Sequence, residues 1–558
     1  MPTQPLTLAK ARAAVAACDK ALREGHPAPS KANGRTGRSA LNAAAAALGV
    51  PRVTLEKRLR RARELHGLAP KWAKVATERV KLAPPPAPPR VAAAAATTRV
   101  VVMTAAQDET GLVERALPAL EAYAAHRGGE IFIGGFTYQK GLFEDHSVRT
   151  GLFTPAVQKY LRPDVVDLAP RLVWHGRANI LPTAGDPLTG WETQTRDAWA
   201  VFPHAKIALK SVPVMPGRPG KQIMTTGVVT RANYVQRNAG QKAEFHHTVG
   251  ATVAEIAPDG TFFCRQIKIA RDGSFQDLDM LVRNGRVERA PPIEAATWGD
   301  IHFEQLDEAK ARASWGWPDG AAGSMLDVLK PKHQFIHDSF DFTARSHHTR
   351  NDPHERARRI VEGRDSVAQM LDGAAAFIAG LRRDWSRVVH VASNHNIHLE
   401  KWLKDPDGAF DPVNARLWHQ LNADWHGAIE AGDDTPPHAR ALAQRLPGAL
   451  ADVTFLREGE SYVICQGVHP IECGLHAHIG PRGARGSPAS LSKIVERVNG
   501  AHTHEPCIRE AAYFAGTSGR LDMPYASKGP GAWHHADIVT YANGARTIVT
   551  HQNGRWRA

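Results

Sequence analysis

Residues that can hold metal ions are concentrated in the second half of the chain. Asp300 and His302 lie two positions apart, directly after a stretch that closes with Trp298 and Gly299. At the end of a β-strand, an Asp and a His at this spacing can both turn into one cleft and bind a cation. Four later segments supply further candidate ligands: His337-Asp338, Ser393-Asn394-His395-Asn396, the loop with His476 and His478, and Ala501-His502-Thr503-His504.

Histidine is unevenly distributed, because 20 of the 28 histidines follow residue 295. Surface exposure accounts for some of them, but such crowding favours a metal site. Most candidate segments also follow apolar, strand-like runs, which lie at residues 333–336, 387–392, 462–466 and 493–498. An α/β protein gathers its site at the carboxyl ends of its strands, so these runs predict that the segments meet at one edge of a sheet.

The order of these segments resembles the calcineurin-like metallophosphoesterase superfamily. That family carries Asp-x-His, Gly-Asp, Gly-Asn-His-Asp/Glu, a lone His and Gly-His-x-His. The chain has counterparts of all five blocks, in that order, between residues 298 and 506. The resemblance covers somewhat under half of the chain. It implies an α/β fold of the metallophosphoesterase type over residues 293–558, an αββα sandwich of two packed sheets flanked by helices.

The resemblance also implies a two-metal centre. Two divalent cations about 3.5–4 Å apart can clamp a phosphate and activate water for attack on it. A mixed set of nitrogen and oxygen donors favours Mn²⁺, with Fe, Zn²⁺ or Mg²⁺ as alternatives. The ligands that the resemblance assigns, with Asp338 bridging both ions, are Asp300, His302 and His504 for one ion and Asn394, His476 and His502 for the other.

The general acid is expected at His395, whose family counterpart lies beside the metals and protonates the leaving oxygen. The chain departs from the family around it. His337, Ser393 and Ala501 replace glycines, which needs only modest backbone adjustment. Asn396 replaces the Asp or Glu that orients the catalytic histidine. It could accept a hydrogen bond from His395, but an uncharged partner raises the imidazole pKa less, which leaves the acid in question.

The lone-histidine block has two possible members, because His476 and His478 are two residues apart. His476 fits better, since the glycine-rich loop 480–487 follows it. In that loop Arg482 and Arg485 could bind scissile or flanking phosphates. The other histidines near the blocks could be structural, line the cleft or lie on the surface: His469, His478 and the pair His347-His348.

Residues 1–82 read as a basic, all-helical domain. They hold 17 Lys and Arg against 5 Asp and Glu, whereas the rest of the chain carries 53 against 51. Two helices are expected on either side of Gly49-Val50-Pro51, with Ser39 as the N-cap of the first. The pattern resembles a helix-turn-helix of the resolvase and transposase kind, and a solvated helical hairpin is the alternative. The second helix would present five residues to DNA: Arg52, Thr54, Lys57, Arg58 and Arg61.

A linker rich in proline and alanine is expected at residues 83–98, because this composition favours an extended chain. Residues 99–292 then read as an α/β and β-rich subdomain that opens with a βαβ unit. No Gly-x-Gly-x-x-Gly follows its first strand, so dinucleotide binding is unsupported. Residues 165–290 carry no recognisable chemistry and could shape the substrate, contact a subunit or serve as scaffold. A β-hairpin around Asn543-Gly544 should finish the sheet.

The composition limits the remaining expectations. Five widely spaced cysteines form no CxxC pair, which suits a reducing compartment. No apolar run reaches about eighteen residues and no signal pattern opens the chain, so no membrane association is expected. The expected location is the cytoplasm, or the host cytoplasm for a phage-encoded protein. A homo-oligomer is left open.

Together these features predict a metal-dependent nuclease that acts on DNA. Joining a phosphodiesterase to a DNA-binding domain raises the effective concentration of substrate at the site. The loop after His476 also resembles that of the DNA-degrading or DNA-transfer metallophosphoesterases of tailed phages. Two alternatives are a phosphatase or small-nucleotide phosphodiesterase, and a non-catalytic DNA-binding protein whose site is degenerate, as Asn396 suggests.

Overall fold

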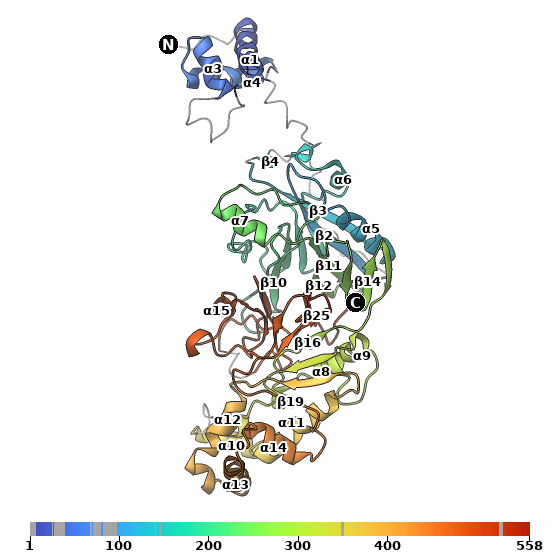
Figure 1. Cartoon of the computed structure of the whole chain (residues 1–558), viewed down its shortest axis with the longest axis vertical. Coiled ribbons are helices and arrows are strands. Elements are labelled where there is room, and N and C mark those ends of the chain that lie inside the picture. The colour runs from blue at the N-terminus through green and yellow to red at the C-terminus, as the bar shows by residue number, and fades with distance from the viewer. Residues whose placement is uncertain are drawn as a thin grey trace. The chain divides into compact units, whose positions relative to one another are not determined.

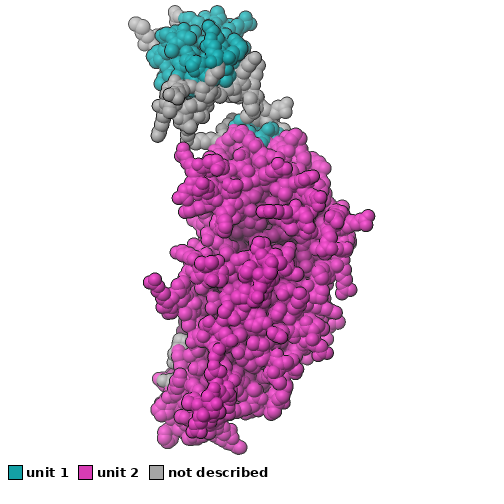
Figure 2. Space-filling view, in the orientation of Figure 1, with its two compact units in different colours: residues 1–81, 143–152 teal, residues 82–142, 153–558 magenta. Residues whose placement is uncertain are grey.

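The protein is described by a computed structural model. It covers residues 7–24, 26, 39–66, 68, 70, 80–81, 97–139, 141–144, 147–346, 351–523 and 528–558. The chain forms two compact units, Met1–Lys81 with Phe143–Leu152, and Leu82–Leu142 with Phe153–Ala558 (Figure 2). Most of the expected linker and the pair His347-His348 lie outside the described residues.

The described residues of the first unit form three helices around a small alanine-rich core. The helices are α1 (Leu8–Arg23), α3 (Ala40–Ala47) and α4 (Arg52–His66) (Figure 1). Ser39 accepts a hydrogen bond from the backbone N–H of Asn42, which confirms the expected N-cap of α3. Gly49 has a φ of +59°, a conformation that glycine adopts without strain, and turns the chain toward α4. Three short strands also belong to this unit: β1 (Val80–Lys81), β4 (Phe143–Glu144) and β5 (Ser147–Val148).

The second unit opens with the βαβ arrangement that the sequence predicts. β2 (Arg99–Gln107) and β3 (Glu130–Phe136) pair in parallel, and α5 (Ala116–His126) lies between them in the chain. β11 (Gly250–Ile256) and β12 (Phe262–Lys268) extend the sheet in the order β12-β11-β2-β3. All of β2 after its first residue is buried, as its run of small and branched residues favours. A separate three-stranded sheet consists of β13 (Phe275–Asp277), β14 (Met280–Arg283) and β15 (Arg286–Arg289).

A six-stranded sheet carries the first three candidate segments. Its order is β19-β18-β17-β16-β25-β26. Four neighbouring strands run parallel: β16 (Ala295–Thr297), β17 (His333–Ile336), β18 (Arg387–His390) and β19 (Thr454–Phe455). The last two strands, β25 (Ala536–Thr540) and β26 (Arg546–Thr550), form an antiparallel hairpin, so the expected C-terminal hairpin is confirmed.

A ten-stranded sheet carries the other two candidate segments. Its strands, in spatial order, are β20 (Val463–Ile464), β21 (Ile471–Glu472), β22 (Arg497–Gly500), β24 (Ala512–Phe514), β23 (Cys507–Arg509), β9 (Leu209–Val212), β10 (Lys221–Thr225), β8 (Trp199–Phe202), β7 (Leu172–His175) and β6 (Val165–Ala169). Leu209 of β9 pairs with Ile508 of β23. The segments expected on either side of residue 292 therefore share one sheet and one compact unit.

Helices cover one face of the six-stranded sheet, and part of the ten-stranded sheet lies against the other. Ile336 packs on the helical side, whereas its neighbour Phe335 packs with Ile464 and Ile471 of the other sheet, as the strand alternation requires. No described helix is long and apolar enough to cross a membrane. The remaining helices of this part are α8 (Glu308–Trp315), α9 (Met325–Leu329), α10 (Pro353–Val361), α11 (Val367–Leu381), α12 (Asn396–Leu403), α13 (Ala415–Ala431) and α14 (Pro437–Arg445) (Figure 1).

Candidate metal centre

The candidate ligands follow the carboxyl ends of five strands. β16 leads to Asp300 and His302, β17 to Asp338, and β18 to Asn394 and His395. In the facing sheet, β21 leads to His476, and the neighbouring parallel strand β22 leads to His502 and His504. Backbone hydrogen bonds join the loops, since His302 N–H donates to the carbonyl of Asp338 and Ala501 N–H donates to the carbonyl of His476. The two sheets therefore bring their strand ends together at one place.

Four of the predicted ligands form a buried cluster. Asp300, His302, Asp338 and His504 each offer a ligand atom, and these atoms all lie within 4.8 Å of one another. His302 Nε2 lies 3.0 Å from His504 Nε2, and His504 Nε2 lies 3.2 Å from Asp300 Oδ2. All four side chains are at most 5% exposed. This is the set that the sequence assigns to the first ion.

The predicted ligands of the second ion lie next to this cluster. His476 Nε2 lies 2.9 Å from Asn394 Oδ1 and 3.3 Å from Asp338 Oδ2. The ring of His502 lies 5.1 Å from the ring of His476, and its backbone N–H donates to Asp300 Oδ2. Asp338 Oδ2 also lies 3.7 Å from His302 Nε2, so the carboxylate of Asp338 stands between the two sets.

The loops that hold these side chains have an unusual backbone conformation. His302, Asp338, His502 and His504 all have φ between +46° and +75°, in the left-handed region. Residues other than glycine occupy this region at a cost, and such residues cluster at functional sites. Four strained positions among seven predicted ligands indicate that the fold holds these side chains in place for a purpose other than packing.

The polar atoms of the cluster fit a bound cation. Asp300 Oδ1, Asp338 Oδ1, His476 Nδ1 and His504 Nδ1 are buried and have no hydrogen-bond partner among the described residues. Burial alone would raise the pKa of Asp300, but His476 and His504 lower it to about 2. Burial likewise opposes the ionised form of Asp338, yet His476 and His395 hold its pKa well below the usual value. Buried anionic oxygens and ring nitrogens that face one another are the donors a divalent metal takes.

Gly299 places the first loop of the cluster by close approach. A Cβ at this position would meet the carbonyl oxygen of Ala536 at 2.9 Å. The Gly299 N–H donates to Asp537 Oδ1 at 2.9 Å, and Asp537 Oδ2 accepts from the fully buried Lys310 at 2.6 Å. The chain segment before Asp300 is therefore joined to β25 through the carboxylate of Asp537, whose other oxygen is paired with Lys310.

Asp341 provides a carboxylate for the predicted general acid. Its Oδ1 lies 3.0 Å from His395 Nδ1 and 3.2 Å from His302 Nδ1. Its own N–H donates to Glu304, which fixes the carboxylate between the two rings. Burial lowers the pKa of His395, but Asp338 and Asp341 together raise it to about 10. With Nδ1 engaged, the Nε2 of His395 is directed toward the cluster, 4.0 Å from Asp338 Oδ2.

The hydrogen bond considered between Asn396 and His395 is absent among the described contacts. Asn396 Oδ1 instead accepts from the N–H and the hydroxyl of Ser393, so its side chain braces the loop before α12. The family motif does not include Asp341, although this residue lies only three positions after Asp338. That closeness to a predicted bridging ligand is the one feature of the sequence that points to Asp341.

His337 is a second residue whose environment the sequence did not reveal. Its side chain is completely buried, and neither ring nitrogen has a hydrogen-bond partner among the described residues. Its ring lies 5.4 Å from that of His476, and the two can form a metal-binding group with Asp300. Burial and the neighbouring His476 lower the pKa of His337 to about 4, so the ring is neutral near pH 7. Neutral imidazole is the form that binds a metal.

The other predicted site residues are not members of this cluster. His478 Nε2 pairs with Glu458 Oε1 at 3.1 Å. Arg482 and Arg485 are exposed on the loop after His476, and neither has a carboxylate partner among the described residues. His469 is exposed. In the first unit, Lys57 and Arg61 of α4 are exposed, Thr54 and Arg58 are half-buried, and Arg52 pairs with Glu56 at 2.9 Å.

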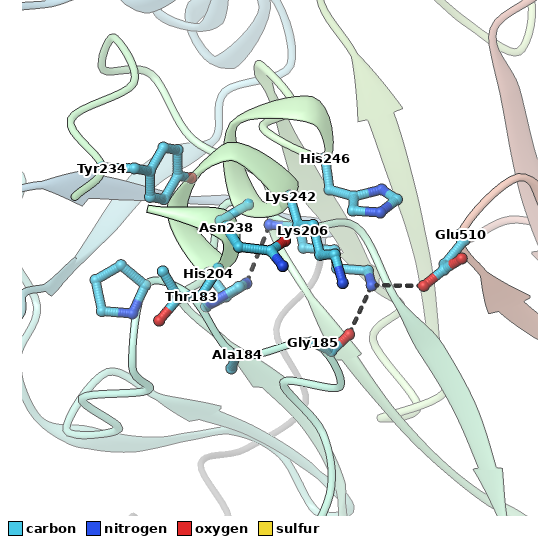
Figure 3. Close-up of a pocket in the computed structure, with 13 residues that line it drawn as sticks. Thr183, Ala184, Gly185, His204, Lys206, Tyr234, Asn238, Lys242, His246 and Glu510 are labelled. Carbon is cyan, nitrogen blue, oxygen red and sulfur yellow. Dashed lines mark hydrogen bonds and ion pairs between the residues drawn. The ribbon is translucent and has the colours of Figure 1, made fainter. Parts of the chain in front are cut away.

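A cavity of about 400 Å³ lies in the β-rich part of the second unit (Figure 3). Lys206 crosses it, donating from Nζ to the carbonyl of Gly185 at 2.6 Å and facing Glu510 Oε1 at 3.3 Å. His204 Nδ1 accepts from the N–H of Lys206 and so fixes its backbone. Glu510 lies in the turn between β23 and β24, so the ion pair links this turn to the loop between β8 and β9 of the same ten-stranded sheet.

Similarity to a phage protein places this chain in a family. No protein-family model matches the chain. Over 466 residues it is 37% identical to Protein A1 of Escherichia phage T5, and the alignment covers 82% of this chain and 82% of that protein. The chain belongs to the Protein A1 family. It is therefore a phage-type protein. Its structure adds a buried His and Asp cluster that could hold metal ions. The name Protein A1 states no activity, so the chemistry of this family member has to be inferred from its site.

Proposed function

We propose that this member of the Protein A1 family is a two-metal phosphodiesterase that acts on DNA. The observation that carries the proposal is the convergence of the ligands. Seven residues assigned from sequence order follow five strand ends, and one of them, the carboxylate of Asp338, lies between His302 and His476. The order of the blocks and the packing of a parallel sheet against a second sheet are both consistent with the metallophosphoesterase resemblance and its αββα sandwich.

The residues present fit two divalent ions, with Mn²⁺ as the first choice. Asp338 would be shared by both ions as a bridging carboxylate. When bound, such a pair of ions polarises the phosphate and activates the attacking water. The other ligands of the first ion would be Asp300, His302 and His504. Those of the second ion would be Asn394, His476 and His502.

His395 has the geometry of a general acid. Its side chain is 16% exposed, so a substrate can reach it, and its Nδ1 is held by Asp341. The carboxylates of Asp338 and Asp341 raise the pKa of the ring, which favours its protonated form. Nε2 would donate that proton to the leaving oxygen of the phosphodiester. Because Asp341 supplies the charge that Asn396 lacks, the main reason to regard the site as degenerate is weakened.

DNA is favoured as the substrate by the charge of the chain. The net positive charge resides almost entirely in residues 1–82, where α4 exposes Lys57 and Arg61. Contacts between such basic side chains and DNA phosphates would supply affinity without sequence preference. Near the cluster, Arg482 and Arg485 are exposed on the loop after His476 and could hold flanking phosphates.

A nuclease assay tests the proposal against its alternatives. Supercoiled plasmid and a single-stranded oligonucleotide are incubated with the protein and Mn²⁺, and Asp338→Ala serves as the inactive variant. We expect cleavage that is lost on chelation and in Asp338→Ala. Hydrolysis of a small aryl phosphodiester with both DNAs left intact would favour a small-nucleotide phosphodiesterase. Binding of DNA without turnover of any substrate would indicate a DNA-binding protein.

A further inference from the structure

An apolar pocket of about 290 Å³ adjoins the metal centre. It opens at the same strand ends, with Ala392 after β18, Glu458 after β19 and residues 474–481 after β21. Leu491 of α15 (Pro488–Leu491) and Ile494 close it on the far side. His476 belongs to its lining, and the fully buried imidazole of this residue lies 3.3 Å from Asp338 Oδ2. A group bound in this pocket would therefore lie beside a phosphate held at the cluster.

The lining of this pocket suits a flat, weakly polar ring. Leu475, Ile479, Leu491 and Ile494 supply the walls, and glycines leave room between them. Ile479 is 40% exposed, so part of this apolar wall is open to a ligand. Phosphates and sugars gain nothing from such walls, whereas enzymes that act on unstacked nucleotides hold the base between apolar or aromatic side chains.

Two polar side chains at the pocket could read the edge of a ring. Glu458 and His478 both line it and pair with each other at 3.1 Å. The carboxylate of Glu458 is about half exposed, so it could leave His478 and bind a base instead. Carboxylates accept a hydrogen bond from the exocyclic amine of cytosine. His478 is 13% exposed and lines the pocket, so a base could contact it there.

We infer that this pocket receives the base of a nucleotide that adjoins the scissile phosphate. The inference rests on the proposed nuclease function and narrows its substrate. A base within a continuous duplex is stacked and paired, so it cannot enter a pocket beside the metal centre. The preferred substrate is therefore DNA with an unstacked nucleotide, as in single strands or frayed ends.

The test compares two single-stranded oligonucleotides in Mn²⁺, identical except for one abasic residue near the middle. The wild-type protein should cleave the linkages next to the abasic residue about tenfold more slowly than the same linkages in the intact strand, since stacking contributes strongly to binding each base. Ile494→Trp, which fills the pocket, should slow cleavage of the intact strand by a similar factor. Val495→Trp is the matched control, because Val495 is 97% exposed and does not line the pocket.

The outcomes separate this inference from the function on which it rests. Absence of any DNA cleavage by the wild-type protein overturns both. Cleavage that ignores the abasic residue, or that proceeds equally fast on single strands and on continuous duplex, overturns only the pocket. If Ile494→Trp fails to fold, as judged by its thermal transition, the abasic comparison in the wild-type protein still decides.

Discussion

At the scale of single residues, the centre depends on side chains that the motif does not include. The ordered blocks predict the candidate ligands because each block is local in sequence. Asp341 is different, since it contacts His395 from a loop 54 residues away, and only the pairing of β17 with β18 brings them together. The partner of the acid could therefore not be predicted from the block that contains His395. The same holds for His337, whose burial follows from the packing of two sheets.

The first prediction concerns Asp341→Asn. Loss of the charge that orients His395 and His302 should lower the rate of DNA cleavage about 10–100-fold at saturating Mn²⁺, the usual effect of removing a residue that orients ligands. Asn396→Ala is the control, and it should keep the rate within a few-fold, because Asn396 contacts Ser393 and not the acid. Steady-state rates on one oligonucleotide measure both. A normal rate in Asp341→Asn with a collapsed rate in Asn396→Ala would reverse the assignment.

At the scale of elements, apolar runs, helical spacing and a turn at Asn543-Gly544 are sufficient to predict the βαβ opening and the C-terminal hairpin. These features cannot predict which strands meet. The pairing of Leu209 with Ile508 joins segments far apart in the chain, and nothing local in either segment encodes that contact. This is why residues 99–292 read as a separate subdomain although five of their strands, β6 to β10, continue the sheet that carries His476 and His502.

Ionised groups also tie elements together inside the second unit. Arg265 of β12 is fully buried and pairs with Glu255 of β11 at 2.6 Å and with Asp277 of β13. Arg127, just after α5, lies 3.0 Å from the same Glu255 carboxylate. Removing one partner from such a cluster leaves a buried charge unpaired, which is strongly destabilising. The cluster therefore fixes α5 and the three-stranded sheet to the four-stranded sheet.

The second prediction is a pH dependence of stability that depends on Glu255. Burial would raise its pKa, but Arg265 and Arg127 lower it from 4.5 to about 2. A carboxyl whose folded pKa is depressed stabilises the fold above its unfolded pKa and loses that effect as the pH falls. The contribution is about 3 kcal/mol near pH 7, and it should disappear between about pH 4.5 and pH 2.

Thermal unfolding of the wild-type protein and Glu255→Gln measures this effect. The variant should melt well below the wild type at pH 7, and the difference should shrink steadily as the pH is lowered toward 3. Glu130→Gln is the control, because Glu130 is 45% exposed and pairs with Arg99 at the surface. A melting difference for Glu255→Gln that does not change with pH would show that the loss is steric and not electrostatic.

At the scale of the whole molecule, charge and chemistry reside in different parts of the chain. The basic excess lies in residues 1–82, and the metal cluster lies in the second unit. Composition alone reveals the first, and motif order reveals the second. Composition cannot show whether α4 contacts DNA, because a solvated basic helix with no DNA role has the same pattern of charges.

The third prediction concerns the salt dependence of DNA binding. Replacing Lys57, Arg58 and Arg61 by alanine removes up to three phosphate contacts, so the slope of log affinity against log salt should become shallower by up to about 0.9 per contact. Binding is measured by fluorescence anisotropy in Ca²⁺ to limit cleavage. The control removes Lys401, Arg416 and Arg286, three exposed charges of the second unit. An unchanged slope in the α4 variant would mean that this helix is not a DNA-binding element.

Manganese stoichiometry tests the proposed metal centre most directly. Protein equilibrated with Mn²⁺ is examined by native mass spectrometry, alongside Asp338→Ala and the surface control Lys401→Ala. We predict two Mn²⁺ ions for each chain of the wild type and of Lys401→Ala, and fewer than two for Asp338→Ala, because both ligand sets share that carboxylate. No bound ion in the folded wild-type protein, or full occupancy in Asp338→Ala, would contradict a two-metal centre at these residues.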